Sequence, residues 1–427
     1  MANRLRIQLI LKKLLTGCLV TLFCGFAGAS AATDADNPNH YELLFSIDLT
    51  KATSKAEASI TLRQTNQLLR EARFKAPRDT YSDFSGDGEI ERKGKYLHWR
   101  PPAKGGTLSY KVLITHERNK GGYDAAVTDD WAIFRGDDIF PPASIMQRTN
   151  VSASSKLQVK RKKNWSIETP YPEQTDGLFR INNPRRIFDR PTGWMITGRL
   201  GIRRDFINNI ETSVAAPLNS GAERIAMLAL LRWTLPILAT ELPEMPEKLS
   251  IVSAGEPMWR GGLSASNSLF VNADIRLISE DATSTLLHET MHVVAPVTTK
   301  RMHDWIDEGI AEYLTLDLLR RSGSISLERF SATLNRFKAR GKHVDDMATA
   351  YASGNITARA VYIFFELDQE LQSQSDGETD ILDLVSVLMT SKTPVDLNEL
   401  RKTCRDLTGA KSIAALSDKN VPGFKIR

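Results

Sequence analysis

Polar and apolar residues alternate over short segments in the first half of the chain. The segments at 56–62 and 108–115 each place their apolar residues on one face. Turn signals rich in glycine and proline, such as residues 86–88, separate these segments. Short alternating strands with frequent glycine and proline turns are typical of a β-sandwich. We therefore predict a β-sandwich domain over residues 32–204.

After about residue 204 the apolar residues recur every three or four positions, which indicates helices. Only the segments 248–253 and 267–272 read as strands. The expected helices are 222–242, 283–294, 306–321, 327–339, 358–371, 380–389 and 397–407. A strand-rich half followed by a helix-rich half predicts an α+β chain. Residues 205–427 form the second predicted domain.

The first 31 residues have the features of a secretory signal peptide. Four basic residues precede an apolar stretch at 14–26, and Ala29-x-Ala31 gives an A-x-A cleavage pattern. An uncleaved anchor is the alternative, but the stretch is shorter than the ~20 residues of a membrane span. We expect an exported protein, periplasmic or secreted in a bacterium, without a membrane span after cleavage. Cys404 is then the single cysteine, so no internal disulfide forms, and we expect it to be buried.

Composition narrows the class of protein further. Hydrophobic residues make up 41% and charged residues 25% of the 427 positions, which excludes a disordered or collagen-like chain. The formal net charge is +5, and four basic residues of the predicted signal peptide supply most of it. The rest of the chain is nearly balanced, so its charge gives no reason to expect nucleic acid as a partner.

The segment His288-Glu289-Thr290-Met291-His292 is an HExxH motif. Two histidines four residues apart on a helix face the same way and can bind one metal ion. Glu289 lies beside them, where it can take a proton from a metal-activated water. Thr283 or Ser284 can cap this helix at its start, and Pro296 follows its end.

A third ligand is expected from the segment 304–313, in which Glu308 follows His292 after fifteen intervening residues. Asp304 is a plausible N-cap of a second helix, on which Glu308 and Glu312 share one face. Two carboxylates on an otherwise apolar helix are costly unless they have partners. Glu308 would complete a His-His-Glu zinc set, and Glu312 would accept a hydrogen bond from a ligand histidine. Gly309 would let the two helices approach closely.

The sequence alone leaves alternatives for the third metal ligand and for the role of the two glutamates. His303 is an alternative third ligand, and a solvated acidic helix face is the alternative for the two glutamates. Two imidazoles with one carboxylate suit zinc best among the common metals.

An HExxH motif followed by W-x-x-E-G-x-A-E-Y, here residues 305–313, resembles the gluzincin zinc peptidases. The segment is similar to the aminopeptidase N and glycyl aminopeptidase branches and to bacterial peptidase MA-like proteins. The resemblance implies His288, His292 and Glu308 as zinc ligands. It also implies Glu289 as general base and Glu312 as a residue that supports a ligand. In these families an all-β domain precedes a thermolysin-like catalytic domain.

The resemblance also implies a residue that stabilises the oxyanion and a strand that binds the substrate. Tyr351 is our choice for the oxyanion, with Tyr362 and His343 as alternatives, and Arg359 is a further candidate contact. The substrate-binding strand should lie within 261–270, where a peptide would pair with Gly261, Gly262, Leu263 and Ser264. The two glycines would allow another chain to approach closely. The family's G-x-M-E-N motif, whose glutamate holds a substrate's amino group, is absent, and Glu256 nearby does not restore it.

The sequence therefore predicts an exported zinc-dependent peptidase that acts on a peptide or protein, with endopeptidase and aminopeptidase activity both open. The alternatives are a catalytically inactive, zinc-binding scaffold or partner-binding protein of the cell envelope, and an envelope protein without metal.

Overall fold

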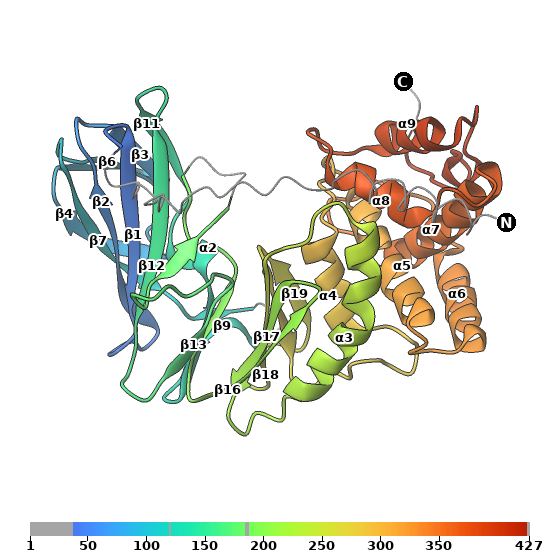
Figure 1. The fold of residues 1–427 in the computed structure, drawn as a ribbon, viewed down its shortest axis with the longest axis horizontal. Coiled ribbons are helices and arrows are strands. Elements are labelled where there is room, and N and C mark those ends of the chain that lie inside the picture. The colour runs from blue at the N-terminus through green and yellow to red at the C-terminus, as the bar shows by residue number, and fades with distance from the viewer. Residues whose placement is uncertain (1–36, 119–120, 184–187, 425–427) are drawn as a thin grey trace, which may run out of the picture. The chain divides into compact units, whose positions relative to one another are not determined.

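Alternating apolar residues build three sheets in the strand-rich half of the chain (Figure 1). The computed structural model describes residues 37–118, 121–183 and 188–424. The predicted signal peptide, residues 1–31, lies outside the described residues. Residues 39–427 form one compact unit.

The largest sheet has six strands in the order β14-β12-β1-β2-β7-β4, and a four-stranded sheet has the order β11-β3-β6-β5. In the six-stranded sheet β1 and β12 are parallel, whereas the other neighbours are antiparallel. The bounds are β1 His40–Asp48, β2 Lys55–Arg63, β3 Leu69–Lys75, β4 Tyr81–Gly86, β5 Glu89–Lys93, β6 Tyr96–Arg100, β7 Gly105–Leu113, β11 Ala143–Gln147, β12 Ser152–Lys160 and β14 Phe179–Ile181.

A third sheet has five strands in the order β13-β15-β10-β9-β8. Their bounds are β8 His116–Glu117, β9 Tyr123–Val127, β10 Trp131–Arg135, β13 Ser166–Glu168 and β15 Trp194–Gly198. The core of this half follows from the period of two along each strand. In β1 the side chains of Leu43, Phe45 and Ile47 are buried, and they share one apolar cluster with Phe74 and Trp99 of the four-stranded sheet. Each such buried side chain contributes about 1.5–3 kcal/mol to folding.

A further sheet of five strands positions the candidate site. Its order is β16-β17-β18-β20-β19, so β19 lies at an edge. The bounds are β16 Leu200–Ile207, β17 Ile210–Pro217, β18 Lys248–Ala254, β19 Gly262–Ala265 and β20 Ser268–Asn272. Every residue of β18 is buried, as expected for a central strand with parallel neighbours. Residue 204, where the sequence places a domain boundary, lies inside β16, and that boundary stays a prediction.

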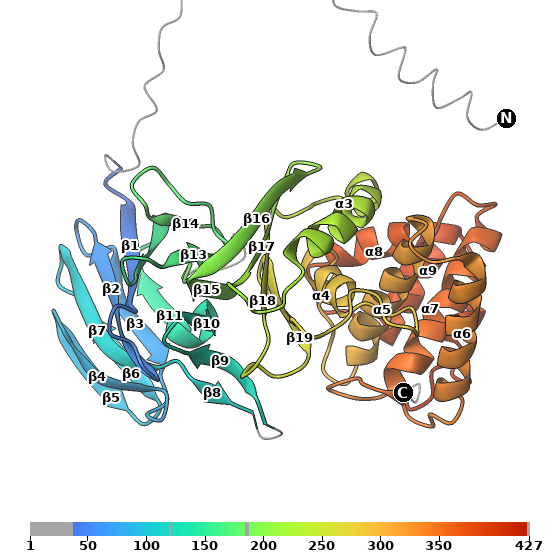
Figure 2. The ribbon, with the colours of Figure 1, turned by 90° about the horizontal axis from the view of Figure 1, so that it is seen from below.

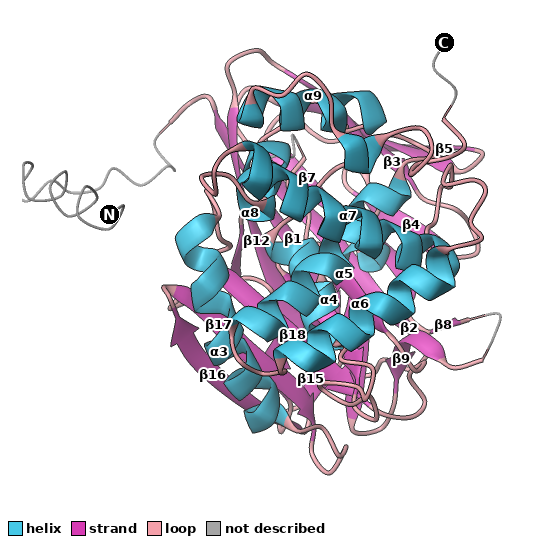
Figure 3. Cartoon of the chain, turned by 90° about the vertical axis from the view of Figure 1, so that its right-hand side faces the viewer, coloured by secondary structure: helices cyan, strands magenta, loops and turns pink. Residues whose placement is uncertain are grey.

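Helices make up most of the remaining chain, and Figure 3 shows them in cyan against the magenta strands. The long helix α3 runs beside β16 and β17 (Figure 2). The bounds are α2 Gly136–Ile139, α3 Arg224–Glu241, α4 Thr285–Val294, α5 Asp304–Arg321, α6 Leu327–Gly341, α7 Asn355–Gln374, α8 Ile381–Met389 and α9 Leu397–Thr408, with a 3-10 turn at Ala414–Leu416. The predicted α+β class, rich in sheet first and in helix later, is confirmed.

The single cysteine outside the predicted signal peptide lies in the helix α9. Cys404 is fully buried, as predicted. Within the described part of the chain, no helix combines the length and the apolar character that crossing a membrane requires.

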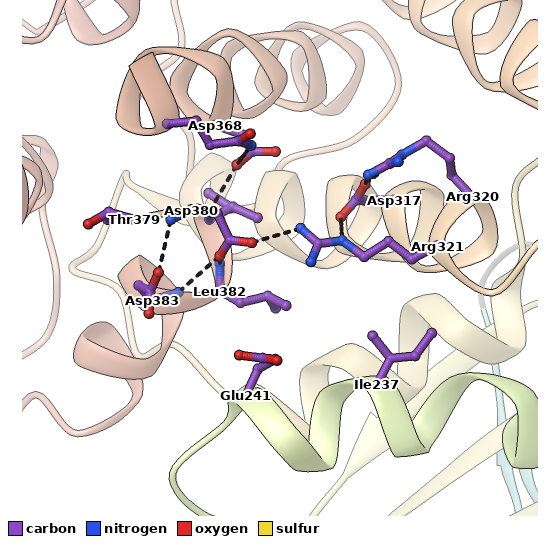
Figure 4. A network of polar contacts seen from close by, with 12 residues as sticks. Ile237, Glu241, Asp317, Arg320, Arg321, Asp368, Thr379, Asp380, Leu382 and Asp383 are labelled. Atoms are coloured by element: carbon purple, nitrogen blue, oxygen red, sulfur yellow. Dashed lines mark hydrogen bonds and ion pairs between the residues drawn. The ribbon is translucent and has the colours of Figure 1, made fainter. Parts of the chain in front are cut away.

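A buried polar network joins the helices α5, α7 and α8 (Figure 4). Asp317 of α5 is 2% exposed and accepts hydrogen bonds from Arg320 and Arg321. Arg321 also donates to Asp380, which caps α8, over 2.9 Å. One turn away, Tyr313 of α5 donates to Asp368 of α7. These bonds fix α5, the helix that carries Glu308 and Glu312, against its neighbours.

Candidate metal centre

The helix α4 presents the two histidines of the HExxH motif on one face. Ser284 caps it, because its side chain accepts a hydrogen bond from the backbone N–H of Leu287. The cap expected from the sequence is confirmed. The opposite face is apolar and buried, so His288 and His292 face α5.

The helix α5 supplies the carboxylates, and its start differs from the prediction. His303 occupies the cap position and Asp304 is the first helical residue, so the expectation that Asp304 is the N-cap was wrong. Its carboxylate instead accepts a hydrogen bond of 2.6 Å from the backbone N–H of Ala352. Asp304 thereby fixes the loop that precedes α7, and the side chain of the N-cap residue His303 accepts no hydrogen bond from the first turn of α5.

Gly309 does permit a close approach, but toward a different helix from the one expected. A Cβ atom at Gly309 would lie 2.7 Å from Cβ of Ala360 and 2.9 Å from the ring of Phe364. Both of these residues belong to α7. The expectation that Gly309 brings α5 close to the HExxH helix was therefore wrong, since the crowding arises on the other face of α5.

Three side chains converge between α4 and α5. His288 Nε2 lies 3.2 Å from His292 Nε2 and 3.4 Å from Glu308 Oε2, and His292 Nε2 lies 3.5 Å from Glu308 Oε1. Among the described residues, this group alone can place three ligand atoms around one ion. Three ligands bonded to one tetrahedral zinc ion at 2.0–2.1 Å are about 3.3 Å apart. The donor types and their spacing therefore fit zinc.

The Nδ1 atom of each histidine also contacts a carboxylate. Nδ1 of His288 lies 2.8 Å from Oε2 of Glu312, and Nδ1 of His292 lies 3.2 Å from Oδ2 of Asp307. Such partners keep the proton on Nδ1 and leave Nε2 free for a metal. Our sequence reading did not include Asp307, although its position beside Glu308 on the same helix was the available signal.

The carboxylates change the acidity of the histidines in the metal-free protein. Burial disfavours the charged imidazole of His288, but bonds to Glu308 and Glu312 outweigh it and raise the pKa to about 9. Burial also disfavours the charged imidazole of His292, but bonds to Asp307 and Glu308 outweigh it and raise the pKa to about 11. Burial would raise the pKa of Glu308, but bonds to both histidines lower it to about 2. The cluster thus holds protons where a metal ion would bind.

Glu289 lies between the histidines and the edge strand β19. Its side chain is largely buried, and this burial raises the pKa of its carboxyl. The backbone N–H of Ser264 donates to that carboxyl. A Cβ atom at Gly262 would lie 2.7 Å from Cγ of Glu289, so glycine is needed there for Glu289 to pack against the strand.

The segment expected to bind a substrate forms the edge of the sheet. Gly262, Leu263 and Ser264 belong to β19, and Gly261 directly precedes it. The space beside the glycines is used differently from our expectation. The indole of Trp259 fills the position of a side chain at Gly261, and Glu289 with Thr285 fills that at Gly262. The close approach at both glycines is therefore made by the chain's own side chains.

The candidates for the oxyanion residue are spread over the helical part. Tyr351 is 87% exposed, in the loop that Asp304 holds before α7. Tyr362 accepts a hydrogen bond of 2.8 Å from Lys338 of α6, so its hydroxyl already has a partner. His343 is exposed beyond the end of α6. Among the described residues, His343 is not part of the ligand group of His288, His292 and Glu308.

Two further candidates have structural partners. The guanidinium of Arg359 donates to the carbonyl oxygens of Gly341, Lys419 and Asn420, so it holds the C-terminal segment and not a substrate. His303 stacks on Phe424 with ring centroids 4.4 Å apart and does not join the ligand cluster.

Comparison with known proteins places this geometry in a known fold. No protein-family model and no curated protein matches the sequence. An aminopeptidase N family protein from Idiomarina loihiensis has a TM-score of 0.61 at 16% identity, covering 90% of this chain and 74% of that one. An M1 zinc metallopeptidase from Deinococcus radiodurans has a TM-score of 0.59 at 14% identity, covering 91% and 94%.

A mutant M1 zinc metallopeptidase from Deinococcus radiodurans with a bound Tyr-Ser-Ala substrate gives a TM-score of 0.60 at 13% identity, covering 91% of this chain and 95% of that one. Identities this low establish similarity of fold. The resemblance that the segment 288–313 indicated is confirmed at this level, and the chain has the fold of the aminopeptidase N family of M1 zinc metallopeptidases.

Proposed function

We propose that this protein is a zinc-dependent peptidase. The observation that supports the proposal most is the convergence of His288, His292 and Glu308, whose ligand atoms are spaced as around one zinc ion. The three residues leave the fourth position of a tetrahedral site open, as in catalytic zinc sites. The likeness to M1 zinc metallopeptidase structures agrees with this chemistry.

The reaction adds the hydroxyl of water to a peptide carbonyl and breaks the C–N bond. When bound, the zinc ion supplies a Lewis acid that polarises the carbonyl and acidifies the water. Glu289 takes the proton from the water and delivers it to the leaving nitrogen. Burial raises the pKa of Glu289, which makes its carboxylate a stronger base for this transfer. Glu312 and Asp307 hold the imidazoles in the tautomer that presents Nε2.

The edge strand β19 supplies backbone groups with which a peptide substrate can pair. Its residues Gly262–Ala265 include no acidic side chain, so the strand offers no partner for a substrate's amino group. For that reason we assign hydrolysis of peptide bonds in general and not removal of N-terminal residues. Tyr351 is the proposed oxyanion residue, since its exposed side chain is free to turn toward a bound substrate.

The wider features of the protein are part of the same proposal. We propose that residues 32–204 are a β-sandwich domain and that residues 205–427 are a thermolysin-like catalytic domain. A signal peptide at 1–31 would direct export to the periplasm or the medium.

Replacement of Glu308 by alanine tests the metal site. We expect wild-type protein, purified without residues 1–31, to hold about one zinc ion per chain and Glu308→Ala to hold almost none, because two ligands bind weakly. Metal content is measured by mass spectrometry, and cleavage is followed with a pool of unstructured peptides. Glu280→Ala is the matched control, because Glu280 is an exposed acid paired with Arg276. This variant should keep both the zinc ion and the cleavage activity.

The outcomes separate the candidate functions. A wild-type protein without zinc, even after zinc is added, would contradict the proposal. Zinc bound without any cleavage would support an inactive zinc-binding scaffold instead.

The raised pKa values of the histidines predict a pH-dependent affinity for zinc. With pKa values of about 9 and about 11, both imidazoles hold protons at pH 7, and binding must displace them. We expect zinc to release about one to two protons at pH 7 and to bind more tightly as the pH rises from 6 to 9. Titration calorimetry in buffers of different ionisation enthalpy measures the release. Unperturbed imidazoles with a pKa of about 6.5 would release only about half a proton in total.

A further inference from the structure

A small cavity lies directly beside the candidate metal centre, at His288 and Glu312. Its volume is about 290 Å³, enough for one amino-acid side chain, and it is open to solvent. The start of α4, the end of α6 and the start of α7 line it. A ligand bound at the metal centre would therefore place one of its neighbouring groups within reach of this cavity.

Arg340 is the one lining cation of the cavity apart from His288. It lies in the last turn of α6 and is exposed. No ion pair of Arg340 is found among the described residues, whereas Arg336, one turn earlier, pairs with Asp281. The other charged group, Glu312, is already bound to Nδ1 of His288. Arg340 is thus the charged group that remains available to a ligand.

The rest of the lining is compatible with a negative group. Thr285 and Thr357 contribute hydroxyl groups. Both lie in the first turns of their helices, α4 and α7, and neither first turn contains an acidic residue. The positive ends of two helix dipoles therefore lie at the cavity without an acidic residue in their own first turns, which adds to the effect of Arg340.

We propose that this cavity binds a carboxylate of the substrate, next to the bond that is cleaved, and that Arg340 determines this specificity. The inference rests on the proposed peptidase function and adds a substrate class to it. The carboxylate can come from an acidic side chain or from the end of a short peptide chain. Both would meet the guanidinium through a charge-assisted hydrogen bond.

Hydroxamates that anchor on zinc test this by binding, without any turnover. The probes are the malonyl hydroxamates of glutamate amide, of glutamine with a free carboxylate, and of glutamine amide. The first carries a side-chain carboxylate, the second a terminal one and the third none. On zinc-loaded wild-type protein we expect one acidic probe to bind about ten-fold more tightly than the neutral probe, the gain of one hydrogen bond to a charged group. The acidic probe that binds more tightly identifies the source of the carboxylate, either the side chain or the chain end.

Variants connect the preference to Arg340. Arg340→Gln should remove the ten-fold difference and leave the affinity of the neutral probe unchanged. Lys338→Gln removes a charge from the same helix, but Lys338 binds Tyr362, so the preference should persist in this control. Equal affinities for all three probes, or a preference that survives in Arg340→Gln, would overturn the inference. Acetohydroxamate reaches only the metal, so its failure to bind would count against the zinc site itself.

Discussion

Replacement of Glu289 by glutamine is expected to lower peptidase turnover by about a hundred- to ten-thousand-fold, the usual contribution of a general base. Glutamine keeps the size of the side chain and can still accept a bond from the N–H of Ser264, but it cannot take a proton from water. Since Glu289 is not one of the three converging ligands, the zinc content should stay at about one ion per chain.

The measurement combines the turnover number on a cleaved peptide with metal analysis of the same sample. Glu280→Gln removes a carboxylate from an exposed position and should leave both values unchanged. A Glu289→Gln protein with near wild-type turnover would show that another group takes the proton. Loss of zinc together with activity would show that Glu289 acts on the metal site and not on the water.

Replacement of Asp317 by alanine is expected to lower the free energy of unfolding by about 3 kcal/mol, the lower end of the range for breaking a buried ion pair. Asp317 is 2% exposed and holds both Arg320 and Arg321 at the end of α5 (Figure 4). Without it, both guanidinium groups lose their shared carboxylate, and Arg321 keeps only Asp380. The lower end of the range applies because both arginines are partly exposed to water.

Denaturant unfolding of the metal-free protein measures this effect without a contribution from bound zinc. Asp281→Ala is the matched control, since Asp281 forms a single exposed pair with Arg336 and its loss should cost well under 1 kcal/mol. A loss below 1 kcal/mol in Asp317→Ala would mean that the network orders the helices without stabilising the chain.

Local patterns predicted much of the candidate site because its spacing is a property of single helices. His288 and His292 share a face whatever the rest of the fold does, and Glu308 and Glu312 do so on α5. The cap at Ser284 likewise depends on a few consecutive residues. These features depend on residues close together in the sequence, and the structure has them at the predicted positions.

Contacts between segments far apart in the chain could not be predicted from local sequence patterns. The partner of Gly309 proved to be α7 because the packing face of a glycine depends on which helix lies opposite. Asp304 bonds to a loop 48 residues away in place of capping its own helix. Asp307 was not among the predicted site residues, because its contact with His292 depends on how α4 and α5 pack together.

By itself, the sequence determined the α+β class, the helix carrying HExxH and the second helix with its carboxylates, because hydrophobic period and residue spacing act over a few turns. Only the tertiary structure decided that three ligand atoms meet at zinc spacing, that Ser264 donates to Glu289, and that Arg340 lies without an ion-pair partner among the described residues beside the metal centre. Each of these depends on packing between elements far apart in the chain, which the free energy of the whole fold determines.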